Sequence, residues 1–155
     1  MNAPVRLLGV DYGSVRMGLA VADLEPPIAF PLATYRRQDA ERDAAYFRQV
    51  AAEQGVGRWV VGLPMHLSGR EGQKAAEARA FGQWLAAATG LPVVFWDERF
   101  TTVEAESALW MAGLTHKKRK GKRDRVAAQI MLQAYLDAGC PEEKEPGPLD
   151  DAPPE

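Results

Sequence analysis

An apolar segment near the start of the sequence, residues 7–10, ends in an acidic residue, Asp11, and Gly13 stands two positions later. A second apolar run follows over residues 17–22. This pattern predicts a buried strand, a tight turn and an antiparallel partner strand. A carboxylate on a buried strand is costly unless it is paired or binds a cation. Asp11 is therefore a candidate catalytic or metal-binding residue, with an ordinary turn residue as the alternative.

Two further acidic residues stand where they could join Asp11. Glu98 follows a predicted strand over residues 92–96, and loops at the carboxyl ends of such strands form sites in open α/β sheets. Asp124 opens a predicted helix whose apolar residues recur at helical spacing, so its side chain should face the sheet. The ordinary alternatives are a surface ion pair for Glu98 and a dipole-stabilised helix start for Asp124. Spacing along the chain does not show that the three acids converge.

Three carboxylates directed at one region repel one another unless divalent cations lie between them. Mg²⁺ and Mn²⁺ both prefer such oxygen ligands, and the carboxylates do not distinguish the two ions. Two ions about 4 Å apart can activate a water and stabilise the leaving oxygen in phosphodiester cleavage. Convergence of Asp11, Glu98 and Asp124 would therefore indicate a metal-dependent nuclease.

A strongly basic segment around Asp124 is predicted to be a mobile loop that binds phosphates. Its charged residues are Lys117, Lys118, Arg119, Lys120, Lys122, Arg123 and Arg125. Because no aromatic residue interrupts the segment, it suggests contacts to a nucleic-acid backbone without base readout. A merely solvated loop is the alternative. Arg16 and Arg99 are further candidates for phosphate binding, and either could pair with Glu98 instead.

The elements that must position these residues are predicted from apolar periodicity and turn residues. Strands are expected over residues 5–12, 15–23, 28–35, 58–63 and 92–96, and helices over residues 39–54, 73–89, 101–111 and 123–138. Three antiparallel strands followed by βαβ units predict an α/β fold with one five-stranded mixed sheet and helices on both faces. The third strand contains a proline and should lie at an edge. The four tryptophans are expected to pack in the core or at an interface.

Length and charge limit the domain organisation. The 155 residues suffice for one domain, predicted over residues 1–139, and residues 140–155 form an acidic, proline-rich segment that predicts a disordered tail. The net charge of −2 hides this division, because residues 1–139 carry 18 basic and 15 acidic groups. A single cysteine, Cys140, excludes an intrachain disulfide and favours a cytoplasmic protein. No apolar run approaches the roughly 20 residues that span a bilayer, so no membrane partner is expected.

Five short motifs connect these candidates to a known family. They are Asp11-Tyr12-Gly13, Arg16-Met17-Gly18, Gly62-Leu63-Pro64, the DERFTT segment that starts at Asp97 and the DRVAA segment that starts at Asp124. The set resembles the YqgF/RuvX family of Holliday-junction-resolvase-like proteins, also described as nucleases for the 5′ end of pre-16S ribosomal RNA. The resemblance runs from Leu7 to Leu136, and the DERFTT segment is its most specific part. It implies a ribonuclease-H-like fold, with Asp11, Glu98 and Asp124 as the metal-binding catalytic acids.

The sequence thus predicts a metal-dependent nuclease for 5′-end processing of pre-16S rRNA, for Holliday junction resolution, or for both. Nucleic acid and ribosomal particles are the expected partners, and symmetric junction cleavage would favour a homodimer. No 2′-hydroxyl reader is recognisable, so RNA and DNA are not distinguished. One alternative is a non-catalytic nucleic-acid or transcription-complex binding module with the same fold. An actin-like phosphotransferase would begin with a similar strand-turn-strand element, but it needs two such domains.

Overall fold

The computed structural model describes residues 6–64, 68, 70–98 and 116–141, with residues 116–122 described by their backbone alone. The predicted helix over residues 101–111 and the tail from residue 142 onward lie outside the described residues. The strands are β1 (Arg6–Asp11), β2 (Arg16–Ala22), β3 (Ala29–Arg36), β4 (Val56–Leu63) and β5 (Val93–Asp97), and the helices are α1 (Ala40–Gln54), α2 (Gln73–Thr89) and α4 (His116–Asp137). No helix in these ranges has the length and apolar character that crossing a bilayer requires.

The five strands form one mixed sheet in the order β3-β2-β1-β4-β5. The first three strands pair antiparallel, and β1 pairs with β4, and β4 with β5, in parallel. The five-stranded mixed sheet is therefore confirmed, and β3 lies at an edge as its proline predicted. In this order β4 separates β1, which carries Asp11, from β5, which leads to Glu98.

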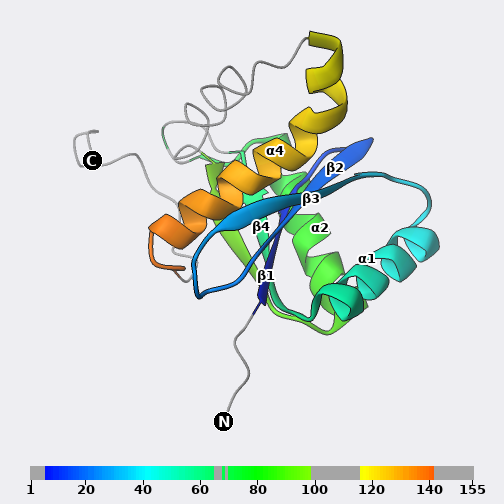
Figure 1. The fold of residues 1–155 in the computed structure, drawn as a ribbon. Coiled ribbons are helices and arrows are strands. Elements are labelled where there is room, and N and C mark those ends of the chain that lie inside the picture. Colours follow the sequence, from blue (N-terminus) through cyan, green and yellow to red (C-terminus); the bar gives the residue numbers. More distant parts are fainter. Residues whose placement is uncertain (1–5, 65–67, 69, 99–115, 142–155) are drawn as a thin grey trace.

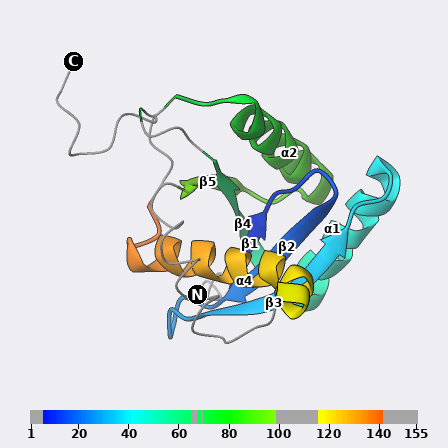
Figure 2. The ribbon, with the colours of Figure 1, turned by 90° about the horizontal axis from the view of Figure 1, so that it is seen from above.

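Helices cover both faces of the sheet, as predicted: α4 lies on one face, and α1 and α2 lie on the other (Figures 1 and 2). Alternation along β1 divides its side chains between two cores. Leu8 and Val10 pack with Phe47 of α1, whereas Leu7 packs with Leu132 of α4. By the same alternation, Asp11 faces the α4 side of the sheet.

The two helices on the other face begin and end close to where the sequence predicts. Asp39 caps α1, because its side chain accepts a hydrogen bond from the backbone N–H of Arg42 at 2.8 Å. Gly55 ends α1 and Gly90 ends α2, with φ of 64° and 70°. These left-handed conformations favour glycine, so local sequence signals set both helix ends.

The prediction for the basic segment is wrong in its secondary structure. Residues 116–122 are the first part of α4, which begins at His116 and not near residue 123. Lysine and arginine are good helix formers, and one glycine at position 121 costs only about 1 kcal/mol relative to alanine. Asp124 therefore lies inside the helix and does not open it. The predicted apolar face is confirmed, since Ala128, Met131, Leu132, Tyr135 and Leu136 are buried against the sheet.

Candidate active site

Glycines on the two strands beside Asp11 make room for its neighbours. Gly18 of β2 lies directly opposite Asp11 in the antiparallel register. A Cβ atom at Gly18 would overlap the backbone carbonyl oxygen of Asp124. A Cβ atom at Gly62 of β4 would overlap Oε1 of Glu98. Without side chains at these two positions, α4 and the Glu98 carboxyl group can both approach the end of β1.

Glu98 reaches Asp11 across an intervening strand. It follows β5, which is not adjacent to β1, and its carboxyl group lies over Gly62 of β4. There it shares a side-chain hydrogen bond with Asp11. The structure thus brings together two of the three acids named by the sequence, although 87 positions separate them along the chain.

Burial and mutual charge shift the titration of both acids. Burial raises the pKa of Asp11 to about 6; the hydrogen bond with Glu98 opposes the rise, the charge of Asp124 adds to it and that of Arg123 opposes it. Burial raises the pKa of Glu98 further, to about 8, and the charge of Asp11 adds to this rise. Near neutral pH, Glu98 therefore holds a proton and donates it in a hydrogen bond to the Asp11 carboxylate. Once Glu98 loses that proton, two buried carboxylates lie in contact, and another positive charge is needed to stabilise them.

The third acid, Asp124, faces the sheet as predicted and is held by an arginine. Nε of Arg16 lies 3.0 Å from Oδ2 of Asp124, in a partly buried ion pair between β2 and α4. Arg16 thus pairs with Asp124, whereas the sequence had offered Glu98 as its partner. In the described ranges, no group of three or more His, Cys, Asp or Glu side chains forms a ready metal site. A metal shared by all three acids stays a prediction.

The structure places the predicted phosphate-binding residues unevenly. Arg123 is exposed on α4, close enough for its charge to lower the pKa of Asp11. Arg99 lies outside the described residues. For Lys117, Lys118, Arg119, Lys120 and Lys122, the structure describes a helical backbone and not the side chains. Their role in binding phosphate therefore stays a prediction.

A cavity of about 370 Å³ opens beside Glu98 at the carboxyl edge of the sheet. Glu98 lies on one wall, and Lys74 and Glu77 from the first turns of α2 lie on another. Gly13 and Ser14 of the turn after β1 complete much of the lining. Sequence reasoning missed Lys74, because one lysine on an exposed helix face has no distinctive pattern. Its ammonium group gives this cavity a cation that can attract a phosphate.

Comparison with known proteins assigns the family. The family model RuvX, described as Holliday junction resolvase, matches residues 5–138. The chain belongs to this family. The predicted resemblance is thus confirmed, and the chain is a nuclease, a hydrolase of phosphodiester bonds.

Similar sequences carry one common description, as candidate pre-16S rRNA nucleases. The protein of Rhodopirellula baltica is 44% identical over 86% of this chain and 77% of its own length. That of Anaeromyxobacter dehalogenans strain 2CP-1 is 44% identical over 88% of this chain and 100% of its own. That of Chloroflexus aggregans is 45% identical over 85% of this chain and 93% of its own.

Solved structures confirm the ribonuclease-H-like fold. Thermus thermophilus RuvC in complex with a Holliday junction substrate superposes with a TM-score of 0.53 at 16% identity, over 94% of this chain and 99% of that chain. Fowlpox virus resolvase, in complex with Holliday junction DNA, superposes with a TM-score of 0.57 at 9% identity, over 88% of this chain and 100% of that chain. At these identities the similarity concerns the fold alone.

Proposed function

We propose that this nuclease cuts structured nucleic acid at the carboxyl edge of β1 and β4, with Asp11, Glu98 and Asp124 as its catalytic acids. The observation that carries the proposal is the hydrogen-bonded pair of Asp11 and Glu98 over Gly62. Two buried carboxyl groups in contact are unfavourable when both are ionised. A site that keeps such a pair beside an open cavity is suited to binding a cation there.

The donor set fits a hard divalent ion, Mg²⁺ or Mn²⁺. Asp11 and Glu98 would supply the first oxygen ligands, and Asp124 would join them if Arg16 released it. When bound, the ion supplies Lewis acidity for an attacking water and neutralises charge on the departing oxygen. Proteins that hold such ions through carboxylates bind them more weakly as the carboxylates become protonated, so activity should require Glu98 to lose its proton.

The side chains of this edge have distinct tasks in the proposed hydrolysis. In this proposal, Lys74 attracts the phosphate into the cavity beside Glu98, and Arg16 contacts a phosphate oxygen once it leaves Asp124. The oxygen of water forms a bond to phosphorus, and the bond from phosphorus to the 3′ oxygen breaks. The departing 3′ oxygen takes up a proton from solvent and becomes a hydroxyl, the attacking water loses one proton to solvent or to an ionised carboxylate, and the other product carries a 5′ phosphate.

The preferred substrate of the proposal is the 5′ end of precursor 16S rRNA. Three relatives above 40% identity, matched over most of their length, are described as candidate pre-16S rRNA nucleases. The choice of the 5′ end comes from the resemblance to the family. The family description also makes a four-way DNA junction a substrate to be tested. In this proposal the enzyme acts in the cytoplasm on RNA that is being assembled into ribosomal particles. Symmetric cleavage of a junction would require a homodimer, whereas trimming one RNA end would not.

The decisive experiment compares cleavage by the wild-type protein and by the Asp11→Asn variant. The substrates are a 5′-extended 16S precursor and a four-way DNA junction, each with Mg²⁺ and with Mn²⁺. We expect cleavage of the precursor that the substitution abolishes while the fold is retained. Unchanged cleavage in the variant would refute the assignment of Asp11. Binding that survives loss of all three acids, without any cleavage by the wild type, would instead support the non-catalytic binding module.

A further inference from the structure

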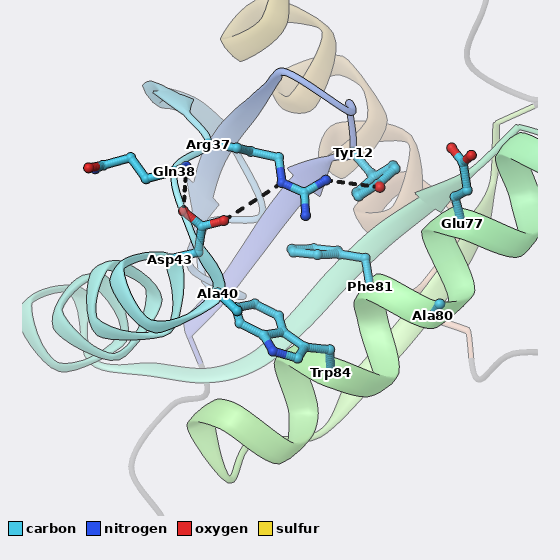
Figure 3. A pocket seen from close by; sticks show the side chains of 9 residues that line it. All are labelled: Tyr12, Arg37, Gln38, Ala40, Asp43, Glu77, Ala80, Phe81 and Trp84. Carbon is cyan, nitrogen blue, oxygen red and sulfur yellow. Dashed lines mark hydrogen bonds and ion pairs between the residues drawn. The ribbon is translucent and has the colours of Figure 1, made fainter.

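A second cavity, of about 360 Å³, lies on the other side of Tyr12 from the acid pair. We refer to it as the aromatic pocket. Figure 3 shows it between the start of α1 and the side of α2 that carries Phe81 and Trp84. The side chains that matter for its chemistry are those of Tyr12, Arg37, Asp43, Glu77, Phe81 and Trp84. We propose that the aromatic pocket binds an unpaired base of the nucleic-acid strand whose neighbouring phosphodiester is cut, an inference that rests on the proposed function.

Two partly exposed aromatic rings, Tyr12 and Trp84, give the pocket a surface suited to stacking, and the buried ring of Phe81 packs against both. The ring centroids of Tyr12 and Phe81 lie 5.1 Å apart, and those of Phe81 and Trp84 lie 5.8 Å apart. Trp84 packs on the core but stays partly exposed, so the sequence-based expectation of packing holds for only part of its ring. Each base of a single strand has a flat face that stacks on such rings without sequence preference.

The aromatic pocket is continuous with the catalytic edge. Tyr12 and Glu77 line both the aromatic pocket and the cavity that holds Glu98 and Lys74. Tyr12 also follows Asp11 directly in the chain. A strand that places a phosphate beside Asp11 and Glu98 therefore has a route by which an adjacent base can enter the pocket. This continuity favours a base of the substrate over an aromatic side chain of a protein partner.

At the base of the pocket, the charges of Arg37 and Asp43 balance each other. Nε of Arg37 lies 3.7 Å from Oδ2 of Asp43. Asp43 also accepts hydrogen bonds from the hydroxyl of Tyr35 at 2.6 Å and from the backbone N–H of Gln38 at 2.9 Å. Arg37 in turn donates to the hydroxyl of Tyr12 at 3.0 Å and lies 5.3 Å from the centroid of that ring. These contacts hold the Tyr12 ring in place between the two cavities.

The test asks whether removing one RNA base and removing the Trp84 ring weaken binding independently of each other. The probe is a fluorescein-labelled, single-stranded RNA that spans the 5′ cleavage site of a 16S precursor, with each nucleotide near the site replaced in turn by an abasic one. Binding is measured with Mg²⁺ in an Asp11→Asn background, so that no strand is cut. We expect one abasic position to weaken binding about tenfold, the size of one base-stacking contact. The same abasic position should have little effect when Trp84→Ala is also present.

Two further variants separate binding from folding. Trp84→Phe keeps an aromatic ring and should retain most of the coupling, even though Trp84 also packs against Phe47. Phe30→Ala removes an exposed ring from β3, at the end remote from the catalytic edge, and should leave the coupling unchanged. If the effects of every abasic position and of Trp84→Ala are additive, the aromatic pocket does not hold a base. Cleavage of the unmodified precursor by the wild type is measured separately and decides the proposed function by itself.

Discussion

The carboxyl group of Glu98 lies over the backbone of Gly62, in the space that a side chain on β4 would fill. Sheet order makes this relationship necessary, because β4 stands between β5 and β1. A side chain at position 62 that faced α4 would block the path from Glu98 to Asp11. Glycine at this position therefore lets the two acids meet.

Substitution of Gly62 by alanine should impair activity more than stability. The added Cβ overlaps the end of the Glu98 side chain, which can rotate away without moving the backbone. We expect cleavage to fall by at least about tenfold, the equivalent of 1.4 kcal/mol, because the acid pair is displaced. Cleavage assays and urea denaturation of the same preparations measure the two effects.

The control for Gly62→Ala uses the Glu98→Ala background. With the Glu98 carboxyl group removed, Gly62→Ala has nothing to displace and should cause little further loss of Mg²⁺ affinity. An equal loss of Mg²⁺ affinity in both backgrounds would show that Gly62 acts on something other than Glu98.

Substitution of Gly18 by alanine should have a different outcome, because the obstacle is backbone. A Cβ at Gly18 would overlap the carbonyl oxygen of Asp124, so α4 would have to move away from β2. Overpacking of this kind typically destabilises by about 1–3 kcal/mol. We expect Gly18→Ala to lower the free energy of unfolding by this amount and also to lower cleavage. An unchanged urea midpoint would contradict the close approach of α4 to β2 at this position.

These glycines show which parts of the site sequence reasoning can reach. Strand and helix bounds depend on local signals such as alternation, the Asp39 cap and the Gly55 stop, and the sequence predicted the bounds of α1, α2 and the strands closely. The meeting of Asp11 and Glu98 depends on the order of strands in the sheet, which no local signal contains. The family motifs contain Gly18 and Gly62, but only the structure gives the steric reason for each.

The error over the basic segment has a physical cause as well. From the sequence alone, a dense run of basic residues favours the prediction of a solvated loop, yet lysine and arginine have high helix propensity. Packing of the later turns of α4 on the sheet can extend a helix into such a segment. The sequence also could not identify the ion-pair partner of Arg16, because Asp124 lies 108 positions further along the chain.

Removal of the Arg16 side-chain charge should affect nucleic-acid binding while leaving stability nearly unchanged. The Arg16–Asp124 ion pair is partly exposed, and such pairs contribute at most about 1 kcal/mol. If a divalent ion on Asp124 releases Arg16 to a phosphate, Arg16→Gln should weaken RNA binding more with Mg²⁺ than with EDTA. The slope of log affinity against log salt should fall by about 1 with Mg²⁺.

A matched control for Arg16→Gln is available in Arg6→Gln. Arg6 pairs with Asp23 at 2.9 Å, in an exposed ion pair at the opposite end of the same strands. The Arg6→Gln substitution should leave both the affinity for RNA and the salt dependence of that affinity unchanged. Equal effects of the two substitutions would indicate that only overall charge matters and would remove the specific role of Arg16.

The metal-free protein should lose stability as the pH rises from about 5 to about 8. The pKa of Asp11 is raised to about 6 and that of Glu98 to about 8, so in this range the folded state holds protons that the unfolded state has released. Unfolding then releases protons, and a rise in pH favours it. The effect levels off below the unfolded-state pKa values of 3.8 and 4.5, where both states are protonated, and above about pH 8, where both are ionised.

Thermal unfolding in EDTA across this pH range measures the effect, and Glu98→Gln isolates its source. This variant has no acid to ionise at position 98, so its Tm should fall much less than that of the wild type between pH 5 and pH 8. Glu53→Gln, on the exposed side of α1, should keep the wild-type slope. Mg²⁺ should raise the wild-type Tm more at pH 8 than at pH 6, because it binds the ionised carboxylates and replaces the lost proton. A Mg²⁺ effect that is the same at both pH values, or that persists in Glu98→Gln, would place the ion away from this pair.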